Sequence, residues 1–118
     1  AVDVTRTNDF EEKHSKCIGD GPCITVKDSN MIANRCINDW LKDIANKKKI
    51  PYQLDVSDGG TTDALSISLS KGGIPTTSIG VAIRNVHTTI GLVHRKDIEN
   101  TIKILELLLR NPPRTCLI

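Results

Sequence analysis

Two side chains lie where they could bind a metal ion or act in catalysis. Asp3 lies within Ala1-Val2-Asp3-Val4-Thr5, a nearly apolar segment that predicts a strand. A carboxylate there must be hydrogen-bonded, paired or metal-bound, because a bare buried charge is costly. His87 follows a second apolar segment, and ligands of open α/β sheets gather beyond the carboxyl ends of strands. The alternatives are a structural aspartate that accepts backbone N–H groups and a solvated loop histidine.

A glycine-rich loop is a further candidate site. The loop Asp58-Gly59-Gly60-Thr61-Thr62-Asp63 precedes a short predicted helix, and helix N-termini present free N–H groups to anions. Asp63 is equally suited to cap that helix, and a single Gly-Gly pair lacks the spacing of a phosphate-binding loop. His14 and His94 lie in charged loops, where we expect them to be solvated. One carboxylate and one imidazole are too few for a complete metal site.

Strands and helices alternate along the predicted secondary structure. Strands are expected over residues 1–5, 23–26, 52–56 and 74–83, and helices over about 29–46, 63–71 and 97–110. This order predicts an α/β fold with a mostly parallel sheet and helices on both faces.

Caps and apolar spacing define the two long helices. The first is expected to begin at a cap, Asp28 or Ser29, and the last at a cap, Asp97. The apolar positions of the first helix are Ile32, Cys36, Ile37, Trp40, Leu41 and Ile44. The expected core stripe of the last helix is Ile98, Ile102, Leu105 and Leu109.

Composition excludes several classes of protein. The chain has 118 residues, enough for one domain, with a net charge of +2 and 3% aromatic residues, which argues against nucleic-acid binding. No apolar run approaches the ~18–20 residues of a membrane span, and no secretory signal opens the chain. The chain begins inside an apolar segment without Met, which suggests a piece of a longer protein.

The four cysteines form no C-x-x-C pair. They are Cys17, Cys23, Cys36 and Cys116. We expect reduced, mostly structural thiols in a cytoplasmic protein, with Cys17 and Cys23 as the one candidate bridge.

Seven segments of the chain, taken in order, form a recognisable series. They are Ala1-Val2-Asp3-Val4-Thr5, Gly19-Asp20-Gly21-Pro22, Asp28, Ile50-Pro51-Tyr52-Gln53, Gly59-Gly60-Thr61-Thr62-Asp63-Ala64, Gly73-Ile74-Pro75-Thr76 and Arg84-Asn85-Val86-His87-Thr88. Together they resemble the carboxyl-terminal third of a family of dinuclear-metal aminopeptidases, which includes glutamyl aminopeptidase and the deblocking, tetrahedral aminopeptidases and has some members that carry an endoglucanase label. The departures are Asn85 for the usual Tyr, Ala82 for Pro, Gly91 for Glu and Leu65 for a small residue.

The resemblance implies that residues 1–118 are a C-terminal fragment of a metallo-aminopeptidase catalytic domain, part of a zinc-peptidase-like α/β/α fold. Two divalent metal ions, zinc or cobalt, are implied in the full-length protein, with Asp3 as a ligand of one and His87 as a ligand of the other. The substrate-binding residues implied are Gly59, Gly60, Thr62 and Asp63. The general base and the other ligands come from upstream in the family, so the fragment alone is expected to be inactive.

The implied partners are a peptide substrate, the missing N-terminal part of the same protein and further copies in a homo-oligomer. No nucleic acid and no membrane are expected. One alternative is a non-catalytic binding or assembly module that keeps the fold. A metal-dependent deacylase or endoglucanase is less favoured, because no opposed pair of carboxylates is evident.

Overall fold

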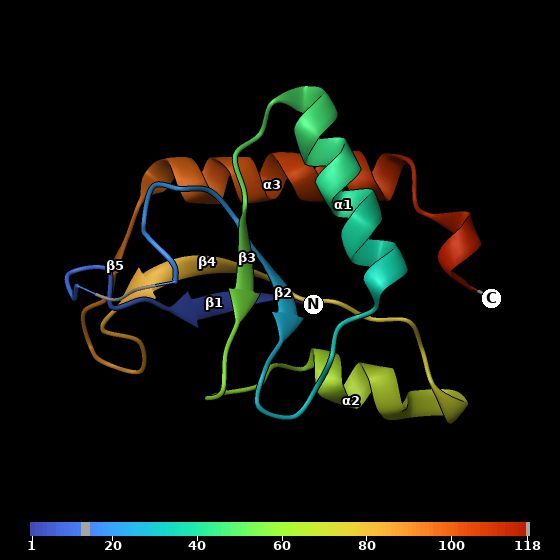
Figure 1. Ribbon diagram of the computed structural model, residues 1–118, viewed down its shortest axis with the longest axis horizontal. Helices are drawn as coiled ribbons and strands as arrows, with labels where there is room; N and C mark the ends of the chain where they lie inside the picture. Colours follow the sequence, from blue (N-terminus) through green and yellow to red (C-terminus); the bar gives the residue numbers. More distant parts are fainter. Residues whose placement is uncertain (13–14, 118) are drawn as a thin grey trace.

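Strands and helices follow one another in nearly the predicted order (Figure 1). The computed structural model describes residues 1–12 and 15–117, so the expectation for His14 lies outside the described residues. The strands are β1 (Val2–Arg6), β2 (Cys23–Lys27), β3 (Gln53–Val56), β4 (Ile79–Arg84) and β5 (Leu92–Val93). The helices are α1 (Arg35–Lys48), α2 (Ala64–Leu69) and α3 (Arg95–Arg110), with short 3-10 turns η1 (Ser70–Gly72) and η2 (Arg114–Leu117). Strand β4 is shorter than predicted, and β5 is an addition.

Two parallel strand pairs make up most of the sheet. Strand β1 pairs with β4 and β2 pairs with β3, both in parallel. A short antiparallel contact between β2 and β4, in which Cys23 faces Gly80 and Ile24 faces Ile79, joins the two pairs. The resulting order is β1-β4-β2-β3, and β5 runs antiparallel to β4. The predicted α/β fold with a mostly parallel sheet is confirmed.

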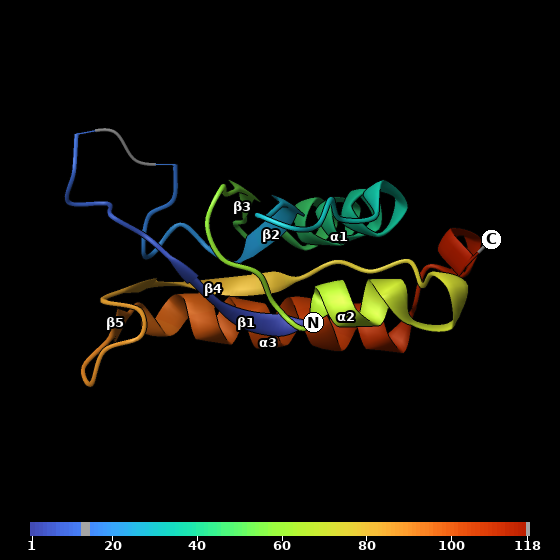
Figure 2. The same ribbon diagram turned by 90° about the horizontal axis from the view of Figure 1, so that it is seen from below.

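The two long helices share one core. Helix α1 contacts β2, α3 contacts β4, and the two helices contact each other. Figure 2 shows β2, β3 and α1 grouped together, with β1, β4 and α3 as a second group. The buried apolar side chains of this core come from both groups and are Ile24, Leu41, Ala45, Ile50, Ile79 and Ile104. Helix α2 packs separately, in a small cluster with Met31 and Ala33.

Side-chain alternation along the central strands places polar groups opposite this core. Ile24 of β2 and Ile79 of β4 are core residues, whereas their neighbours Thr25, Ser78 and Gly80 line a cavity. Successive residues of a strand point to opposite faces of the sheet. The face away from the core therefore contributes to the wall of the cavity.

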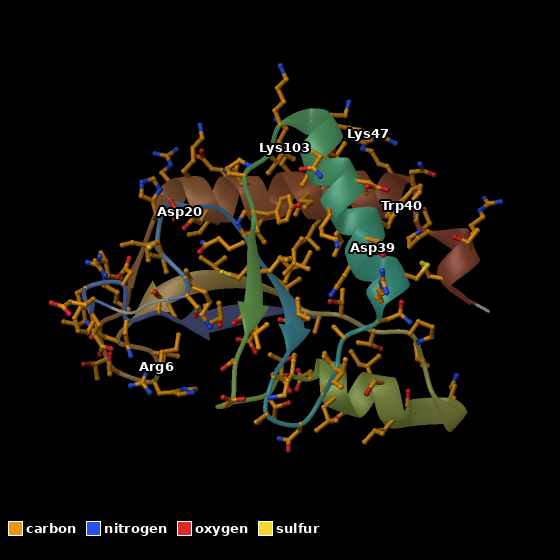
Figure 3. The ribbon with its side chains drawn as sticks, viewed as in Figure 1. Arg6, Asp20, Asp39, Trp40, Lys47 and Lys103 are labelled. Carbon is orange, nitrogen blue, oxygen red and sulfur yellow. A yellow bond between two sulfur atoms is a disulfide. The ribbon has the colours of Figure 1, made fainter. Side chains whose placement is uncertain are left out.

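Charged side chains cover the outer surfaces of the helices. Lys47 of α1 and Lys103 of α3 are exposed and extend away from the sheet (Figure 3). Trp40 of α1 lies near the end of α3, where its indole N–H donates to the Asn111 carbonyl at 3.1 Å. Among the described helices, none has both the length and the hydrophobicity needed to cross a bilayer.

Helix α1 begins later than predicted. Its N-cap is Asn34, whose side chain accepts the N–H of Ile37 at 3.0 Å. The predicted cap, Asp28, instead accepts two backbone N–H groups from the three residues that follow it. Such a turn competes with helix formation. Leu41 of the predicted stripe is buried, whereas Ile32 lies outside the helix and is exposed.

Helix α3, in contrast, begins before its predicted cap. His94 is the N-cap, and its Nδ1 accepts the N–H of Lys96 at 3.1 Å. Asp97 is fully buried and accepts the N–H of Gly19 at 2.7 Å and that of Gly21 at 3.0 Å. Asp97 therefore joins α3 to the turn before β2, and the exposed His94 has a structural role that the sequence did not indicate.

The buried face of α3 differs from the predicted stripe. The buried residues of this helix are Asp97, Asn100, Thr101 and Ile104. Ile98, Ile102 and Leu109 are 40%, 60% and 76% exposed, and Leu105 alone of the predicted stripe packs against the core. The helix has apolar residues on two sides, and the contacts of Asp97 turn the Ile104 side toward the sheet.

One disulfide replaces the expected set of reduced thiols. Cys36, in the first turn of α1, is bonded to Cys116 of η2, with Cα atoms 5.5 Å apart. Cys17 and Cys23 are free, so the predicted bridge between them is wrong. Eighty positions separate the bonded cysteines, and only the packing of the C-terminal segment beside α1 brings them together.

Candidate metal and substrate site

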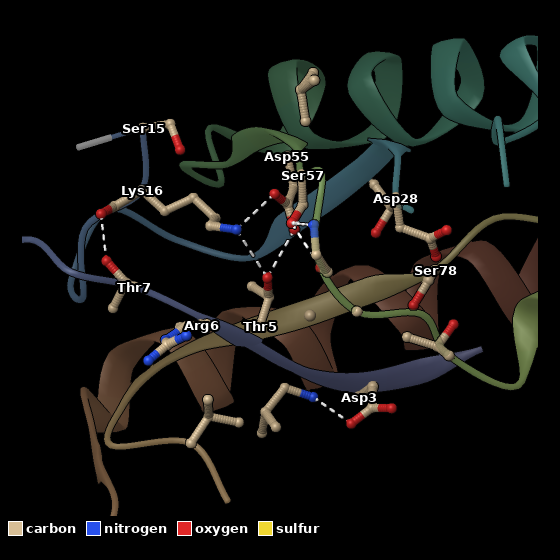
Figure 4. Close-up of a pocket in the computed structure, with 18 of the residues that line it drawn as sticks. Asp3, Thr5, Arg6, Thr7, Ser15, Lys16, Asp28, Asp55, Ser57 and Ser78 are labelled. Atoms are coloured by element: carbon tan, nitrogen blue, oxygen red, sulfur yellow. Dashed lines mark hydrogen bonds and ion pairs between the residues drawn. The ribbon is translucent and has the colours of Figure 1, made fainter. Parts of the chain in front are cut away.

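A cavity of about 620 Å³ brings the two main sequence candidates together. Asp3 of β1 and His87, three residues beyond β4, both line it. In the parallel pairing of β1 with β4, Asp3 lies opposite Gly80, so His87 lies seven positions beyond the partner of Asp3 and the cavity extends from one to the other. Figure 4 shows the cavity with Asp3 at its lower edge and Asp28 and Asp55 above.

Asp3 presents an accessible carboxylate to this cavity. The residue is exposed, and its Oδ1 accepts the N–H of Val4 at 2.7 Å. Within the described residues this is its one hydrogen bond, so Oδ2 remains available to a cation. The position of Asp3 is defined by β1, where it pairs in register with Gly80 of β4.

His87 lies on a tight turn after β4. Its φ is +59° and that of Asn85 is +58°, both in the left-handed region. The Thr88 hydroxyl donates to the Asn85 carbonyl at 2.6 Å and to the Ile90 carbonyl at 2.9 Å, which stabilises the turn. A histidine at positive φ is strained, and such strain gathers at functional sites. The imidazole is exposed and free of hydrogen bonds to the described residues.

Asp3 and His87 are chemically suited to a divalent cation but are incomplete. A carboxylate and an imidazole are both common ligands of zinc. The described residues contain no group of three or more His, Cys, Asp or Glu side chains arranged around one point. Any complete site therefore requires ligands from outside this part of the structure.

The glycine loop forms another part of the cavity wall. Gly59, Gly60 and Thr62 line the cavity, whereas Asp63 is exposed and does not. Ser29 donates to the Gly60 carbonyl through its N–H at 3.1 Å and through its hydroxyl at 2.7 Å. The loop is thus anchored to the segment after β2, with backbone groups left next to the cavity. Asp63 is the N-cap residue of α2, as the sequence suggested, although its side chain makes no capping bond, and its predicted role in substrate binding stays a prediction.

A buried polar network that the sequence did not reveal lies along the cavity. Lys16 Nζ donates to Asp55 Oδ1 at 2.7 Å and to the Thr5 hydroxyl at 3.0 Å, and that hydroxyl donates to Asp55 Oδ2 at 2.7 Å (Figure 4). The Lys16 and Asp55 side chains are 8% and 6% exposed. Asp55 could have been recognised as a carboxylate within an apolar strand, and it is buried, whereas Asp3, which the sequence suggested was buried, is exposed. The sequence contains no signal for Lys16, which lies in a loop.

A second ion pair joins the same loop to the end of β4. Arg84 Nε lies 2.6 Å from Asp9 Oδ1, and Asp9 Oδ2 accepts the N–H of Ile18 at 3.0 Å. The hydrogen bond from Arg84 lowers the pKa of Asp9, and Asp9 in turn raises the pKa of Arg84. This pair fixes the strand from which the turn to His87 departs.

Comparison with known proteins identifies the family. The sequence model of the M42 glutamyl aminopeptidases matches residues 1–104. The chain belongs to this M42 family of aminopeptidases, as the seven segments indicated.

The chain is similar to about one third of longer aminopeptidases. An Acetivibrio thermocellus protein named as an aminopeptidase is 41% identical over 108 residues, which are 89% of this chain and 32% of that protein. The solved structure of an aminopeptidase from the archaeon Desulfurococcus kamchatkensis superposes with a TM-score of 0.91 at 32% identity, covering 98% of this chain and 34% of that one. The TET1 peptidase of Pyrococcus horikoshii, described as able to assemble into a tetrahedron or a large octahedral shell, gives a TM-score of 0.72 at 26% identity, covering 91% and 32%.

Proposed function

We propose that the protein containing this chain is a metal-dependent aminopeptidase, which removes N-terminal residues from peptides, and that residues 1–118 are the C-terminal portion of its catalytic domain. The observation that carries the proposal is that Asp3 and His87, far apart in sequence, line the same cavity in a chain of the M42 family. The non-catalytic module remains the alternative.

Asp3 and His87 would hold two divalent cations, zinc or cobalt, one residue as a ligand of each. When bound, such a pair of ions ionises a water molecule and polarises the scissile carbonyl group. The chain's own part is to orient these two ligands: β1 holds the carboxylate and the strained turn holds the imidazole. The remaining ligands and the general base would come from the part of the protein outside this chain.

Gly59, Gly60 and Thr62 are proposed to bind the peptide substrate. A β-carbon added at Gly59 or Gly60 would meet no atom within 4 Å, so the backbone there is open to a bound chain. Both carbonyls and the Gly59 N–H are bonded to Ser57 or Ser29, so within the described residues the Gly60 N–H is the group proposed to bind the backbone of the peptide. Asp63, which follows this loop but lies outside the cavity lining, is also proposed to bind substrate.

The longer protein is further proposed to form homo-oligomers, since the similar TET1 peptidase is described as assembling into closed particles. The cytoplasmic location expected from the sequence stays a prediction. Neither proposal alters the chemistry assigned to the cavity.

The test compares the longer protein with residues 1–118 alone, using aminoacyl-anilides as substrates and added zinc or cobalt. We expect turnover by the longer protein, loss of at least about 100-fold in kcat/KM for Asp3→Ala and His87→Ala, and negligible turnover by the 118-residue chain. An Arg95→Gln variant on the outer side of α3 serves as the control. A folded longer protein that binds no divalent ion and cleaves no anilide would favour the non-catalytic module.

A further inference from the structure

The two strand groups that surround the cavity share a hydrophobic core, but few ladder bonds join the strands themselves. The segment before β4 is bonded to the other group through the Thr25 N–H, which donates to the Ser78 carbonyl, and through the Thr77 hydroxyl, which donates to Asn38. Candidate ligands Asp3 and His87 belong to the β1–β4 pair, whereas the loop with Gly59 and Gly60 follows β3 of the β2–β3 pair. The antiparallel contact between these pairs covers two residue pairs at the start of β2. The backbone ladder alone therefore leaves the spacing of ligands and substrate loop loosely defined.

The network of Thr5, Lys16 and Asp55 crosses the gap between the groups. Thr5 belongs to β1 and Asp55 to β3, strands that are not neighbours in the sheet. Lys16 lies between them and bonds to both (Figure 4). Its own carbonyl accepts the Thr7 hydroxyl, which fixes the Lys16 backbone to the segment after β1.

The bonds of Thr5 to Lys16 and Asp55 also restrain the position of Asp3, which lies on the same strand. Thr5 and Asp3 are two positions apart on that strand, so their side chains share a face. Thr5 also packs closely on Gly80 of β4, where an added β-carbon would lie 3.1 Å from its Cγ2. Gly80 is the register partner of Asp3. The Thr5 side chain is thus held by Gly80 on one side and by Lys16 and Asp55 on the other.

Buried ion pairs seldom stabilise a fold more than apolar contacts would, because both charges lose their hydration. What such a pair does supply is a defined geometry, since its hydrogen bonds tolerate little displacement. We propose that Thr5, Lys16 and Asp55 are positioning residues, which set the location of Asp3 relative to the substrate loop. This inference rests on the proposed function.

The first test uses Thr5→Val and Thr5→Ser in the longer protein. Valine keeps the packing on Gly80 but lacks the hydroxyl, whereas serine keeps the hydroxyl. We expect Thr5→Val to raise the dissociation constant for Co²⁺ about tenfold, to alter the Co²⁺ absorption spectrum, and to lower kcat with KM nearly unchanged. Thr5→Ser, which keeps the hydroxyl, should have the parental Co²⁺ affinity, absorption spectrum and kcat. If Thr5 acted only through packing and stability, Thr5→Ser would be the more damaging of the two substitutions.

A double variant, Lys16→Met with Asp55→Leu, removes both charges together and guards against misfolding of Thr5→Val. It should fold and show the same loss of Co²⁺ affinity. The control is Arg95→Gln with Glu99→Gln, an exposed ion pair on α3, which should change none of these measurements. Folded variants that keep the parental Co²⁺ affinity and kcat would overturn the inference. Failure of both variants to fold would assign the network to stability and would also overturn it.

The proposed function and the positioning role fail in different ways. The proposed function is wrong if the parent protein does not bind Co²⁺, or if its Co²⁺ affinity equals that of the His87→Ala variant. In either case the inference is wrong as well. If binding is present and is lost in His87→Ala, but Thr5→Val behaves as the parent does, only the positioning role is wrong.

Discussion

Backbone conformation at single residues decides where the candidate ligands point. Asn85 and His87 both have positive φ, and asparagine accepts this region more readily than most residues do. The departure from the family's usual Tyr at position 85 is therefore compatible with the turn. Histidine is also enriched in this region, and the remaining cost at His87 is offset by surrounding contacts, among them those of Thr88.

Among the described glycines, Gly21 is the one at which a larger residue should destabilise the fold most. Its φ is +98°, and an added β-carbon would lie 2.2 Å from the Pro51 carbonyl oxygen. We expect Gly21→Ala to lower the free energy of unfolding by more than about 2 kcal/mol, since the left-handed conformation alone costs roughly 1–2 kcal/mol. Denaturant unfolding measures the change. Gly72→Ala, at φ +79° with open space around it, is the control and should cost only the roughly 1–2 kcal/mol of the left-handed conformation.

The Asp9–Arg84 pair makes stability depend on pH in the acid range. The pKa of Asp9 is lowered in the folded state, chiefly by the hydrogen bond from Arg84. Its contribution is present in full above the ordinary pKa of aspartate and is lost as the pH falls through the lowered value. Between roughly pH 4 and pH 2, the unfolding free energy of the parent should therefore decrease more steeply than that of Asp9→Asn. Parallel curves for the two proteins would contradict this.

At the scale of elements, the two predicted helix caps bond to backbone groups outside the helices they were expected to cap. The predicted cap Asp28 forms a turn, and the predicted cap Asp97 anchors the glycine turn before β2. Aspartate is a common N-cap residue, but the carboxylates of Asp28 and Asp97 accept backbone N–H groups that lie outside α1 and α3. The consequence for α3 is a buried face that the spacing of Ile98 and Ile102 did not indicate.

The disulfide fastens η2 to the first turn of α1. It closes a loop with a sequence separation of 80 residues, and such a crosslink restricts the unfolded chain strongly. We expect reduction to lower the free energy of unfolding by about 2–4 kcal/mol. Urea unfolding with and without reductant measures this, with Cys36→Ser plus Cys116→Ser as the control that reductant should not affect. Titration of four free thiols in the unreduced, unfolded protein would show that the bond is absent.

At the scale of the whole molecule, apolar surface remains uncovered on several elements. Val2 of β1, Val56 of β3 and Ile102 of α3 are 56%, 59% and 60% exposed. β1 and β3 are the outer strands in the order β1-β4-β2-β3, so backbone groups along their outer edges are open to pairing. Surface of this kind is typical of contact with further protein.

The isolated 118-residue chain should therefore associate with itself. We expect sedimentation velocity to show species larger than a monomer at micromolar concentration. Ile102→Glu with Leu109→Glu should reduce association while leaving the helix content in circular dichroism unchanged, because both side chains point away from the core. Lys103→Glu, also exposed on α3, is the matched control for charge. A monomer over the whole concentration range would contradict the prediction.

The sequence by itself determined the α/β class and most of the elements, and it offered Asp3 and His87 as candidate ligands, a role that stays a prediction. It could do so because apolar periodicity and short motifs are local properties of the chain. The tertiary structure alone decided which face of α3 is buried, which cysteines join, and that Lys16 lies between Thr5 and Asp55. Each of these depends on the packing of residues distant in sequence, where several partners are chemically equivalent and geometry selects one.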